Sequence, residues 1–280
     1  MPLSLENVSL IYDEGTAFET RALHELSFTI KDGEFVGVMG HTGSGKSTVL
    51  QVIDGLMKPE SGRVLLDGED INARSYDRRK LRAAVGMVFQ YPECQLFETT
   101  VEKDVAFGLK HAGLSRTEIA ERVNAALSAV GFEPETVKAK SPLGFSGGEK
   151  RRIAIAGILA AKPRFLLLDE PIAGLDPLGR AAFIKLLKKL NAEGTTVIMV
   201  SHNADSIAEC ASRVLVFEDG RLVEDGATAE VFADIEKMKN RHIGVSRSRE
   251  LAGLLGLSDG ICRYDELKNA VIASLKGGAV

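Results

Sequence analysis

The sequence lacks several features that would assign it to a familiar class. It has no tryptophan and only three cysteines, Cys94, Cys210 and Cys262, which lie far apart and form no CxxC pair. This spacing excludes a disulfide scaffold and predicts three reduced, buried thiols in a cytosolic protein. No apolar run approaches the roughly 18 residues that cross a bilayer. The N-terminus also lacks the basic flank and apolar core of a signal peptide.

Neither sign of charge is in large excess. The chain has 35 Lys and Arg against 39 Asp and Glu, a formal charge of −4, which argues against a simple basic nucleic-acid binder. Hydrophobic residues make up 45% and charged residues 26% of the chain, as in an ordinary globular protein. Its 280 residues allow one large domain or two modest ones.

Short apolar runs alternate with helical patterns along most of the chain. The strand candidates are 35–40, 84–90, 164–170 and 196–202. Each is nearly continuous in apolar residues, which is typical of strands covered on both faces. Helical patterns at 46–56 and 180–191 lie between them. The alternation predicts an α/β fold with a mostly parallel sheet.

Other segments predict antiparallel ribbons and a helical insertion. Alternating residues at 3–12 and 22–30, and Asp-Gly turns at Asp67-Gly68 and Asp219-Gly220, are typical of hairpins. Residues 115–131 form an amphipathic helical pattern that begins with a capping box, Ser115 and Glu118. We therefore expect a helical insertion at about residues 91–162. Beyond Phe232 only helical patterns remain.

The strongest local signal is GHTGSGKST, which fits GxxxxGK[ST], follows a predicted strand and opens a predicted helix. Glycines let backbone N–H groups cradle phosphate oxygens, and the helix directs its positive end at them. Lys46 supplies a charge to the phosphates, and Ser47 offers a hydroxyl to Mg²⁺. The predicted nucleotide-binding residues are Gly40, His41, Thr42, Gly43, Ser44, Gly45, Lys46, Ser47 and Thr48.

An apolar strand that ends in two acids supplies the second part of such a site. The run FLLLDE ends at Asp169 and Glu170. Asp169 is the candidate for anchoring Mg²⁺, and Glu170 for polarising the attacking water. An apolar run capped by acids is also a common strand end, so the prediction depends on the phosphate loop upstream.

The segment FSGGE, residues 145–149, precedes a helical pattern. Ser146 and Glu149 have capping-box spacing, and Gly147 and Gly148 leave backbone N–H groups uncovered. An ordinary capped helix would look the same. Here, however, the segment resembles the signature motif of ATP-binding-cassette ATPases, in which Ser146, Gly147, Gly148 and Glu149 would contact the nucleotide of a partner.

That resemblance covers residues 3 to about 230 and implies further roles. Tyr12 is similar to the aromatic that stacks on adenine, although a half-buried strand tyrosine is the alternative. Gln90 resembles the glutamine that touches the metal or water, and Asp176 the acid that communicates across a dimer. His202 resembles the switch histidine at the γ-phosphate. The implied fold is a P-loop cassette with a RecA-like core, an antiparallel β-subdomain and a helical signature subdomain. The implied ligands are ATP and Mg²⁺.

The stretch YPECQLFETTVEKDVAFG, after Gln90, strongly resembles the ATPases of energy-coupling factor transporters. In that family this segment, Gln90–Gly108, grips a membrane-embedded coupling subunit, and a separate membrane subunit binds a vitamin or transition-metal ion. The resemblance implies a peripheral protein at the cytoplasmic face of a bacterial or archaeal cell membrane, with no nucleic-acid partner. Residues 1–230 would form the nucleotide-binding domain, and 231–280 a helical appendage that helps to hold two cassettes together.

Three residues depart from the usual cassette pattern. Glu149 stands where most cassettes have Gln, Phe145 where Leu is usual and Ile172 where many relatives have Thr, which puts equal hydrolysis at two sites in doubt. The glutamate at position 149 favours a pair of unlike cassettes, and a homodimer is the alternative. Alternative functions are a cassette of another importer class, a soluble cassette acting on DNA or ribosomes, and a purely regulatory subunit.

Overall fold

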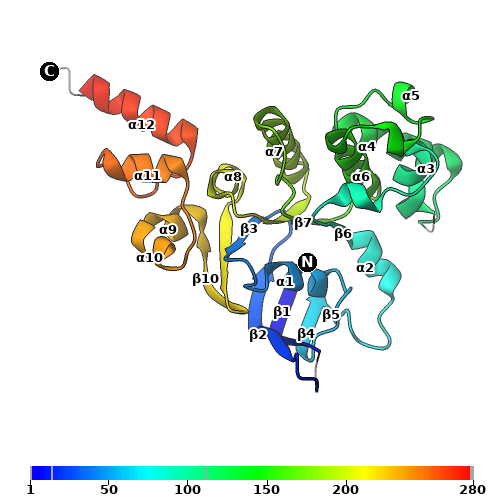
Figure 1. Cartoon of the computed structure of the whole chain (residues 1–280), viewed down its shortest axis with the longest axis horizontal. Coiled ribbons are helices and arrows are strands. Elements are labelled where there is room, and N and C mark those ends of the chain that lie inside the picture. Colours follow the sequence, from blue (N-terminus) through cyan, green and yellow to red (C-terminus); the bar gives the residue numbers. More distant parts are fainter. Residues whose placement is uncertain (1, 14, 111, 278–280) are drawn as a thin grey trace. The chain divides into compact units, whose positions relative to one another are not determined.

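A computed structural model describes residues 2–13, 15–110 and 112–277 of the chain (Figure 1). The chain forms two compact units. The first unit comprises the chain up to Tyr76 and from Ile198 onward, and the second comprises Asp77–Val197. The C-terminal residues therefore belong to the same unit as the N-terminal ones. The predicted domain boundary near residue 230 stays a prediction.

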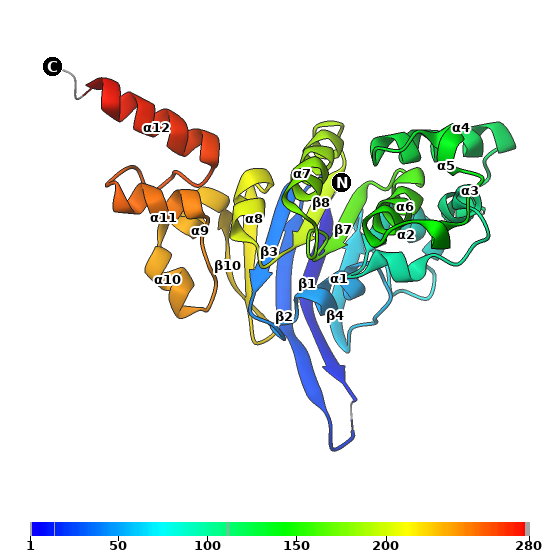
Figure 2. The same ribbon diagram turned by 45° about the horizontal axis from the view of Figure 1, so that its top comes forward.

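The predicted ribbons form an antiparallel sheet in the first unit, with strand order β2-β1-β4-β5 (Figure 1). Its strands are β1 (Leu3–Tyr12), β2 (Thr20–Ile30), β4 (Ser61–Leu66) and β5 (Glu69–Asp70). Figure 2 shows strands β2, β1 and β4 of this sheet side by side. Asp67 and Gly68, which join β4 to β5, have φ values of 58° and 83°. Two consecutive positive φ angles are the signature of the tight hairpin turn that Asp-Gly favours.

The same unit contains a parallel strand pair that supports the phosphate loop. Strand β3 (Phe35–Gly40) is buried at every residue and pairs in parallel with β9 (Arg213–Glu218). Strand β9 then pairs antiparallel with β10 (Arg221–Ala227). Continuous burial along β3 explains its unbroken apolar sequence.

The helices of the first unit are α1 (Lys46–Ile53), α8 (Ala204–Cys210), α9 (Thr228–Ala233), α10 (Ile235–Asn240), α11 (Arg247–Leu254) and α12 (Tyr264–Gly277). Among them, α1, α11 and α12 match the predicted helical segments, while α8 and α9 were not predicted. Only helices follow β10 among the described residues, as predicted. No helix in the described ranges is long and apolar enough for a membrane span.

The second unit combines a parallel strand pair with the predicted helical insertion. Strand β6 (Val85–Val88) pairs in parallel with β7 (Phe165–Asp169), while β8 (Thr196–Val200) spans the boundary between the units. The helices are α2 (Arg78–Ala84), α3 (Val101–Ala106), α4 (Arg116–Ala129), α5 (Pro134–Val137), α6 (Gly147–Ala160) and α7 (Pro177–Ala192). Three 3₁₀ turns are η1 (Pro92–Gln95), η2 (Phe107–Leu109) and η3 (Pro142–Gly144).

Helix α6 lies at the centre of the insertion and contacts both α3 and α4 (Figure 1). The predicted stripe of α4 faces inward, because Val123 and Leu127 are buried to 1% exposure or less. The predicted capping box starts α4, and Gly131, at φ 84°, follows its end. Periodicity and capping residues thus located this helix correctly.

Candidate functional site

Two glycines of the phosphate loop meet backbone from elsewhere in the first unit. A Cβ atom on Gly40 would lie 2.3 Å from the carbonyl oxygen of Phe217 and 2.5 Å from Ser44 Oγ. Gly45, the N-cap of α1, has a φ of 96°, and its Cβ would lie 2.8 Å from the carbonyl oxygen of Ala22. Both positions therefore require glycine. Among the residues that the structure describes, no side chain caps α1, so its N-terminus suits an anionic ligand.

Lys46 lies inside this loop and is only 6% exposed. Its Nζ donates hydrogen bonds to the carbonyl oxygens of Gly40 at 2.8 Å and His41 at 2.6 Å, and to Ser44 Oγ at 3.2 Å. The loop backbone thus holds an ammonium charge next to the N-terminus of α1. This arrangement can neutralise phosphate oxygens.

A cavity of about 470 Å³ opens beside the loop, and its walls include Tyr12, Lys46, Ser47 and Thr48. The structure therefore brings the predicted adenine-stacking tyrosine and the phosphate loop to one cavity. The Tyr12 hydroxyl lies 3.0 Å from Thr48 Oγ1 and 3.3 Å from Met57 Sδ. These two contacts hold the tyrosine against α1.

Six residues of this cavity wall were not predicted as site residues: Thr20, Arg21, Ala22 and His24 of β2, and Asp219 and Gly220 of the β9–β10 hairpin. Burial, followed by the charges of Arg221 and Arg21, lowers the pKa of His24 below its usual 6.5. The surroundings of His24 therefore favour the neutral imidazole. Strand alternation predicted β2 and the hairpin, but it carries no information about which loop they approach.

The β9–β10 hairpin also holds the phosphate loop in place. Gly220 N donates to the carbonyl oxygen of Ser44 at 3.1 Å, and Gly220 O accepts from His24 N at 2.9 Å. His41 Nε2 lies 3.3 Å from Asp219 Oδ1. The predicted loop residue His41 thus faces the hairpin, which braces the loop from a distant part of the sequence.

In the second unit, Asp169 ends β7 and is 7% exposed. Glu170 follows with a φ of 47°, which is unusual for a residue with a side chain. The buried Arg151 of α6 donates from Nη1 to the carbonyl oxygen of Ala173 at 2.5 Å and from Nη2 to that of Glu170 at 3.2 Å. Burial lowers the pKa of Arg151. No local sequence pattern predicts that this arginine fixes the turn at Glu170.

The signature segment starts α6 with the predicted capping box. Ser146 N donates to Glu149 Oε2 at 2.9 Å, and Glu149 N donates to Ser146 Oγ at 3.4 Å. Both residues and Gly148 line a cavity of about 440 Å³, together with Asp176 and Gly179. Asp176 Oδ1 also accepts from Gly179 N at 2.6 Å, so it caps α7. The structure thus gathers the signature residues and Asp176 at one cavity.

The other predicted residues follow the ends of buried strands. Gln90 is exposed two residues after β6, and His202 is exposed two residues after β8. Gln90, Asp169 and Glu170 belong to the second unit with the signature segment, while His202 belongs to the first with the phosphate loop. The roles assigned to these residues stay predictions.

Two phenylalanines stand out on the segment that follows Gln90. Phe97 is 63% and Phe107 46% exposed. Their rings pack edge to face with centroids 4.8 Å apart and an interplanar angle of 87°. Exposed aromatic pairs of this kind are typical of protein contact surfaces.

The acidic residues beside this aromatic pair differ in whether their carboxylates are bonded within the protein or exposed to a partner. Glu98 Oε1 pairs with Lys110 Nζ at 3.1 Å. Asp104 accepts hydrogen bonds from Glu98 N at 2.9 Å and Phe97 N at 3.4 Å. Burial raises the pKa of Asp104, although these hydrogen bonds oppose the shift. Asp104 therefore supports the loop from within, while Glu102 is exposed.

The prediction of three buried thiols is wrong for two of them. Cys94 is exposed, Cys210 is half-buried and only Cys262 is buried. Burial raises the pKa of Cys262 to about 11. Cys94 lies in η1, a turn on the surface of the insertion, where a small apolar residue has no core to fill.

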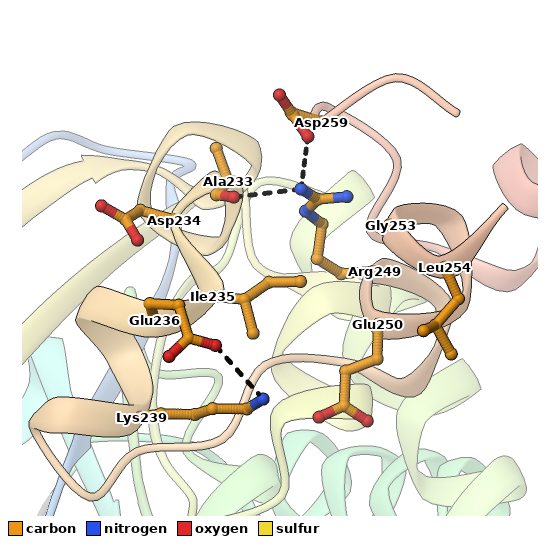
Figure 3. A pocket seen from close by; sticks show the side chains of 10 residues that line it. All are labelled: Ala233, Asp234, Ile235, Glu236, Lys239, Arg249, Glu250, Gly253, Leu254 and Asp259. Atoms are coloured by element: carbon orange, nitrogen blue, oxygen red, sulfur yellow. Dashed lines mark hydrogen bonds and ion pairs between the residues drawn. The ribbon is translucent and has the colours of Figure 1, made fainter. Parts of the chain in front are cut away.

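A further cavity, of about 830 Å³, lies between α10 and α11 in the C-terminal part of the first unit (Figure 3). Arg249 is 4% exposed, donates to the carbonyl oxygen of Ala233 at 3.1 Å and pairs with Asp259. Glu236 pairs with Lys239 at 3.6 Å on the same wall. Arg249 thus ties α11 to the end of α9, and the cavity mixes charges of both signs.

Comparison with known proteins bears on this geometry. A family model described as "ABC transporter" matches residues 23–173, which contain the phosphate loop, the signature segment and Asp169. The chain is 43% identical over 283 residues to the energy-coupling factor transporter ATP-binding protein EcfA2 of Caldanaerobacter subterraneus subsp. tengcongensis, covering 99% of each chain. It is 49% identical over 255 residues to EcfA2 of Symbiobacterium thermophilum, covering 91% and 88% of the two chains.

Solved structures with the same fold include CbiO1 of Clostridium perfringens, described as part of the ABC transporter complex cbiONQ. It has a TM-score of 0.74 and 37% identity, and the match covers 91% of this chain and 98% of that one. The ATP-binding cassette MJ0796, solved as a dimer bound to ADP and Pi, has a TM-score of 0.71 and 33% identity, covering 81% and 98%.

The phosphate loop, the signature helix and these matches define an ABC-type ATPase, which confirms the predicted fold class and enzyme class. The predicted resemblance is confirmed as well. The chain belongs to the ABC transporter family, among the ATP-binding proteins of energy-coupling factor transporters.

Proposed function

We propose that this chain is the ATP-hydrolysing subunit of an energy-coupling factor importer and acts in a dimer of cassettes. The observation that carries the proposal is that the chain bears two cavities, each lined by some of the expected nucleotide-binding residues. One is the phosphate-loop cavity of the first unit, and the other is the signature cavity of the second. The related cassette MJ0796 is described as dimeric. Two cassettes arranged head to tail would bring each phosphate loop to the signature helix of the other.

The nucleotide-binding roles follow from the first cavity. Tyr12, held by Thr48, would stack on adenine, and Lys46 would neutralise the β- and γ-phosphates. The loop residues Gly40–Thr48 would cradle the phosphates with backbone N–H groups. Ser146, Gly147, Gly148 and Glu149 of the partner cassette would close over them, with Asp176 at the same interface.

The residues proposed for Mg²⁺ fit that ion by their chemistry. Ser47 offers a hydroxyl, Gln90 an amide oxygen and Asp169 a buried carboxylate at a strand end, and hard oxygen ligands are what Mg²⁺ prefers. Bound Mg²⁺ would supply positive charge to the phosphate oxygens. Asp169 is held rigidly because all five residues of β7 are buried.

The proposed chemistry is attack of water on the γ-phosphorus, with breakage of its bond to the β,γ-bridging oxygen and release of ADP and phosphate. The Glu170 carboxylate would orient the water and accept its proton, and His202 would contact the γ-phosphate. Arg151 supports this role, since it holds the backbone carbonyl of Glu170.

Transport would follow from coupling this cycle to a membrane subunit. The exposed pair Phe97 and Phe107 in Gln90–Gly108 offers an apolar contact. We propose that it seats a membrane-embedded coupling subunit at the cytoplasmic face of the cell membrane. A separate membrane subunit would bind the imported vitamin or transition-metal ion. An unlike cassette is favoured as the second ATPase, in line with the Glu149 variant.

The experiment is to purify the complex with this chain tagged, identify its subunits, and compare Glu170→Gln with the surface control Glu121→Gln. We expect Glu170→Gln to keep ATP binding and to lower turnover by about 10²–10⁴-fold, the worth of a positioned base. Near-normal hydrolysis by this variant would contradict the assignment, and a tagged chain without membrane subunits would contradict the transport role.

A further inference from the structure

Two helices of the second unit begin with the same capping box. Helix α4 begins at Ser115, whose N donates to Glu118 Oε2 at 2.8 Å, while Glu118 N donates to Ser115 Oγ at 3.3 Å. Helix α6 begins at Ser146 with the same pair of bonds to Glu149, at 2.9 and 3.4 Å. Both helices have 14 residues. The chain thus contains one capping device in two surroundings.

The two boxes differ in what surrounds the serine. Ser146 lines the signature cavity with Gly148 and Asp176, whereas Ser115 lines none of the cavities described here. In both boxes the serine side chain hydrogen-bonds to the glutamate; at α6 the Ser146 hydroxyl donates to Glu149 Oε2 at 2.7 Å. The carboxylate of Glu149 therefore holds both the backbone N–H and the hydroxyl hydrogen of Ser146.

These are the groups that the signature helix would present to a nucleotide phosphate, because a helix N-terminus and a serine hydroxyl both bind anions. A hydroxyl has one hydrogen to donate. A phosphate oxygen can receive it only after Glu149 has released it. The carboxylate and the phosphate also carry charge of the same sign, so they compete for the same end of the helix.

The charge of Glu149 is present under ordinary conditions. The hydroxyl of Ser146 and then its backbone N–H lower the pKa of Glu149 below its usual 4.5, with smaller contributions from Arg152 and Lys140. A glutamine at this position would keep the bond from Ser146 N through its amide oxygen. It would carry no charge, so the competition would weaken while the helix stayed capped.

We propose that Glu149 is an internal competitor for nucleotide phosphate, so that this chain's signature closes on ATP more weakly than an uncharged signature would. This inference rests on the proposed function, because it needs two cassettes that share their ATP sites. It identifies a residue that sets the ATP requirement of one site through the hydroxyl of Ser146. A glutamate at position 149 in one cassette would therefore make the two shared ATP sites of the pair unequal in their affinity for ATP.

The test compares Glu149→Gln with the matched control Glu118→Gln in the purified transporter complex. We expect Glu149→Gln to lower the ATP concentration for half-maximal hydrolysis by about two- to fivefold, the usual worth of a charge at a helix N-terminus. Glu118→Gln should leave that concentration unchanged. Both variants should shift the melting temperature by the same small amount, because each loses one charged cap. In a Glu170→Gln background, Glu149→Gln should also increase the ATP retained by the complex.

The outcomes separate this inference from the one on which it rests. If the complex hydrolyses ATP and Glu149→Gln behaves like Glu118→Gln, the competition is refuted and the proposed function stands. A higher ATP requirement in Glu149→Gln would refute it too, since the carboxylate would then assist binding. If Glu170→Gln has normal turnover, the proposed function fails and this inference fails with it.

Discussion

Arg151 provides the most direct test of how the fold prepares the residue proposed to activate water. We consider Arg151→Met, which keeps much of the buried aliphatic volume and removes the guanidinium. Arg151 donates to the carbonyl oxygens of Ala173 and Glu170 at 2.5 and 3.2 Å. Hydrogen bonds from a charged group contribute roughly 1.5–3 kcal/mol each. Relief of burying the charge offsets part of this, so we expect a net loss of about 2–4 kcal/mol in the free energy of unfolding.

Arg151→Met should also lower kcat, because Arg151 holds the backbone turn that carries Glu170. Glu170 has a φ of 47°, a conformation that costs about 1–3 kcal/mol and persists only when its surroundings enforce it. Without Arg151 the turn can relax and move the carboxylate. A displacement of about 1 Å can lower a rate about 10²-fold. We therefore expect kcat to fall by about two orders of magnitude, with little change in nucleotide affinity, because Lys46 and Tyr12 lie in the other unit.

The assay is steady-state hydrolysis by the purified complex across ATP concentrations, with nucleotide binding and thermal unfolding measured in parallel. Arg122→Met is the control, because Arg122 donates to the carbonyl oxygen of Ala161 at 3.3 Å and touches no part of the Glu170 turn. It should lose stability and keep kcat. Equal kcat in the two variants would refute the positioning role of Arg151.

Three further predictions concern other parts of the chain. Replacing Phe97 and Phe107 together by Ser should detach the membrane subunit in co-purification, because it removes the exposed aromatic pair. The control Leu143→Ser, at a residue 71% exposed in η3, should keep the membrane subunit bound. Equal recovery of the membrane subunit with both variants would contradict the contact. The pKa values of Glu118 and Glu149 lie below their usual 4.5, so the stability that the two charged caps give the folded protein is complete above that pH and is lost as the pH falls through the folded-state values. The melting temperatures of the wild type and of the Glu118→Gln/Glu149→Gln double variant should therefore converge in acid. A constant difference between them would argue against charged caps. At pH 8 a maleimide should modify the exposed Cys94 in the folded protein. It should leave the buried Cys262, whose pKa burial raises to about 11, unmodified until the protein unfolds. Mass spectrometry of the peptides checks this, and modification of Cys262 before Cys94 would contradict it.

Local patterns predicted most of the fold. The fully buried strands β3, β7 and β8 were visible as apolar runs, and helix α4 as a stripe with a capping box. Such features depend on neighbours within a few residues of each other in the sequence. The signature cap at Ser146 and Glu149 was predictable for the same reason.

The unpredicted parts of the site depend on contacts between distant segments. Arg151 reads as one of several basic residues in a helix, and nothing nearby shows that it reaches Glu170. His24 and Gly220 approach the phosphate loop because strands meet, not because of their own sequence surroundings. The exposure of Cys94 likewise reflects the place of its turn in the fold rather than its residue type.

The brace formed by the β9–β10 hairpin has a consequence for how the protein is made. Gly40 packs against the carbonyl oxygen of Phe217, and Gly220 N bonds to the carbonyl oxygen of Ser44. These partners are synthesised about 175 residues after the loop, which at about 5–20 residues per second corresponds to roughly 9–35 s. During that interval the nascent chain carries its most recognisable motif without the strand that shapes it. A ribosome-bound chain would acquire its ability to bind ATP only after the β9–β10 hairpin has been synthesised.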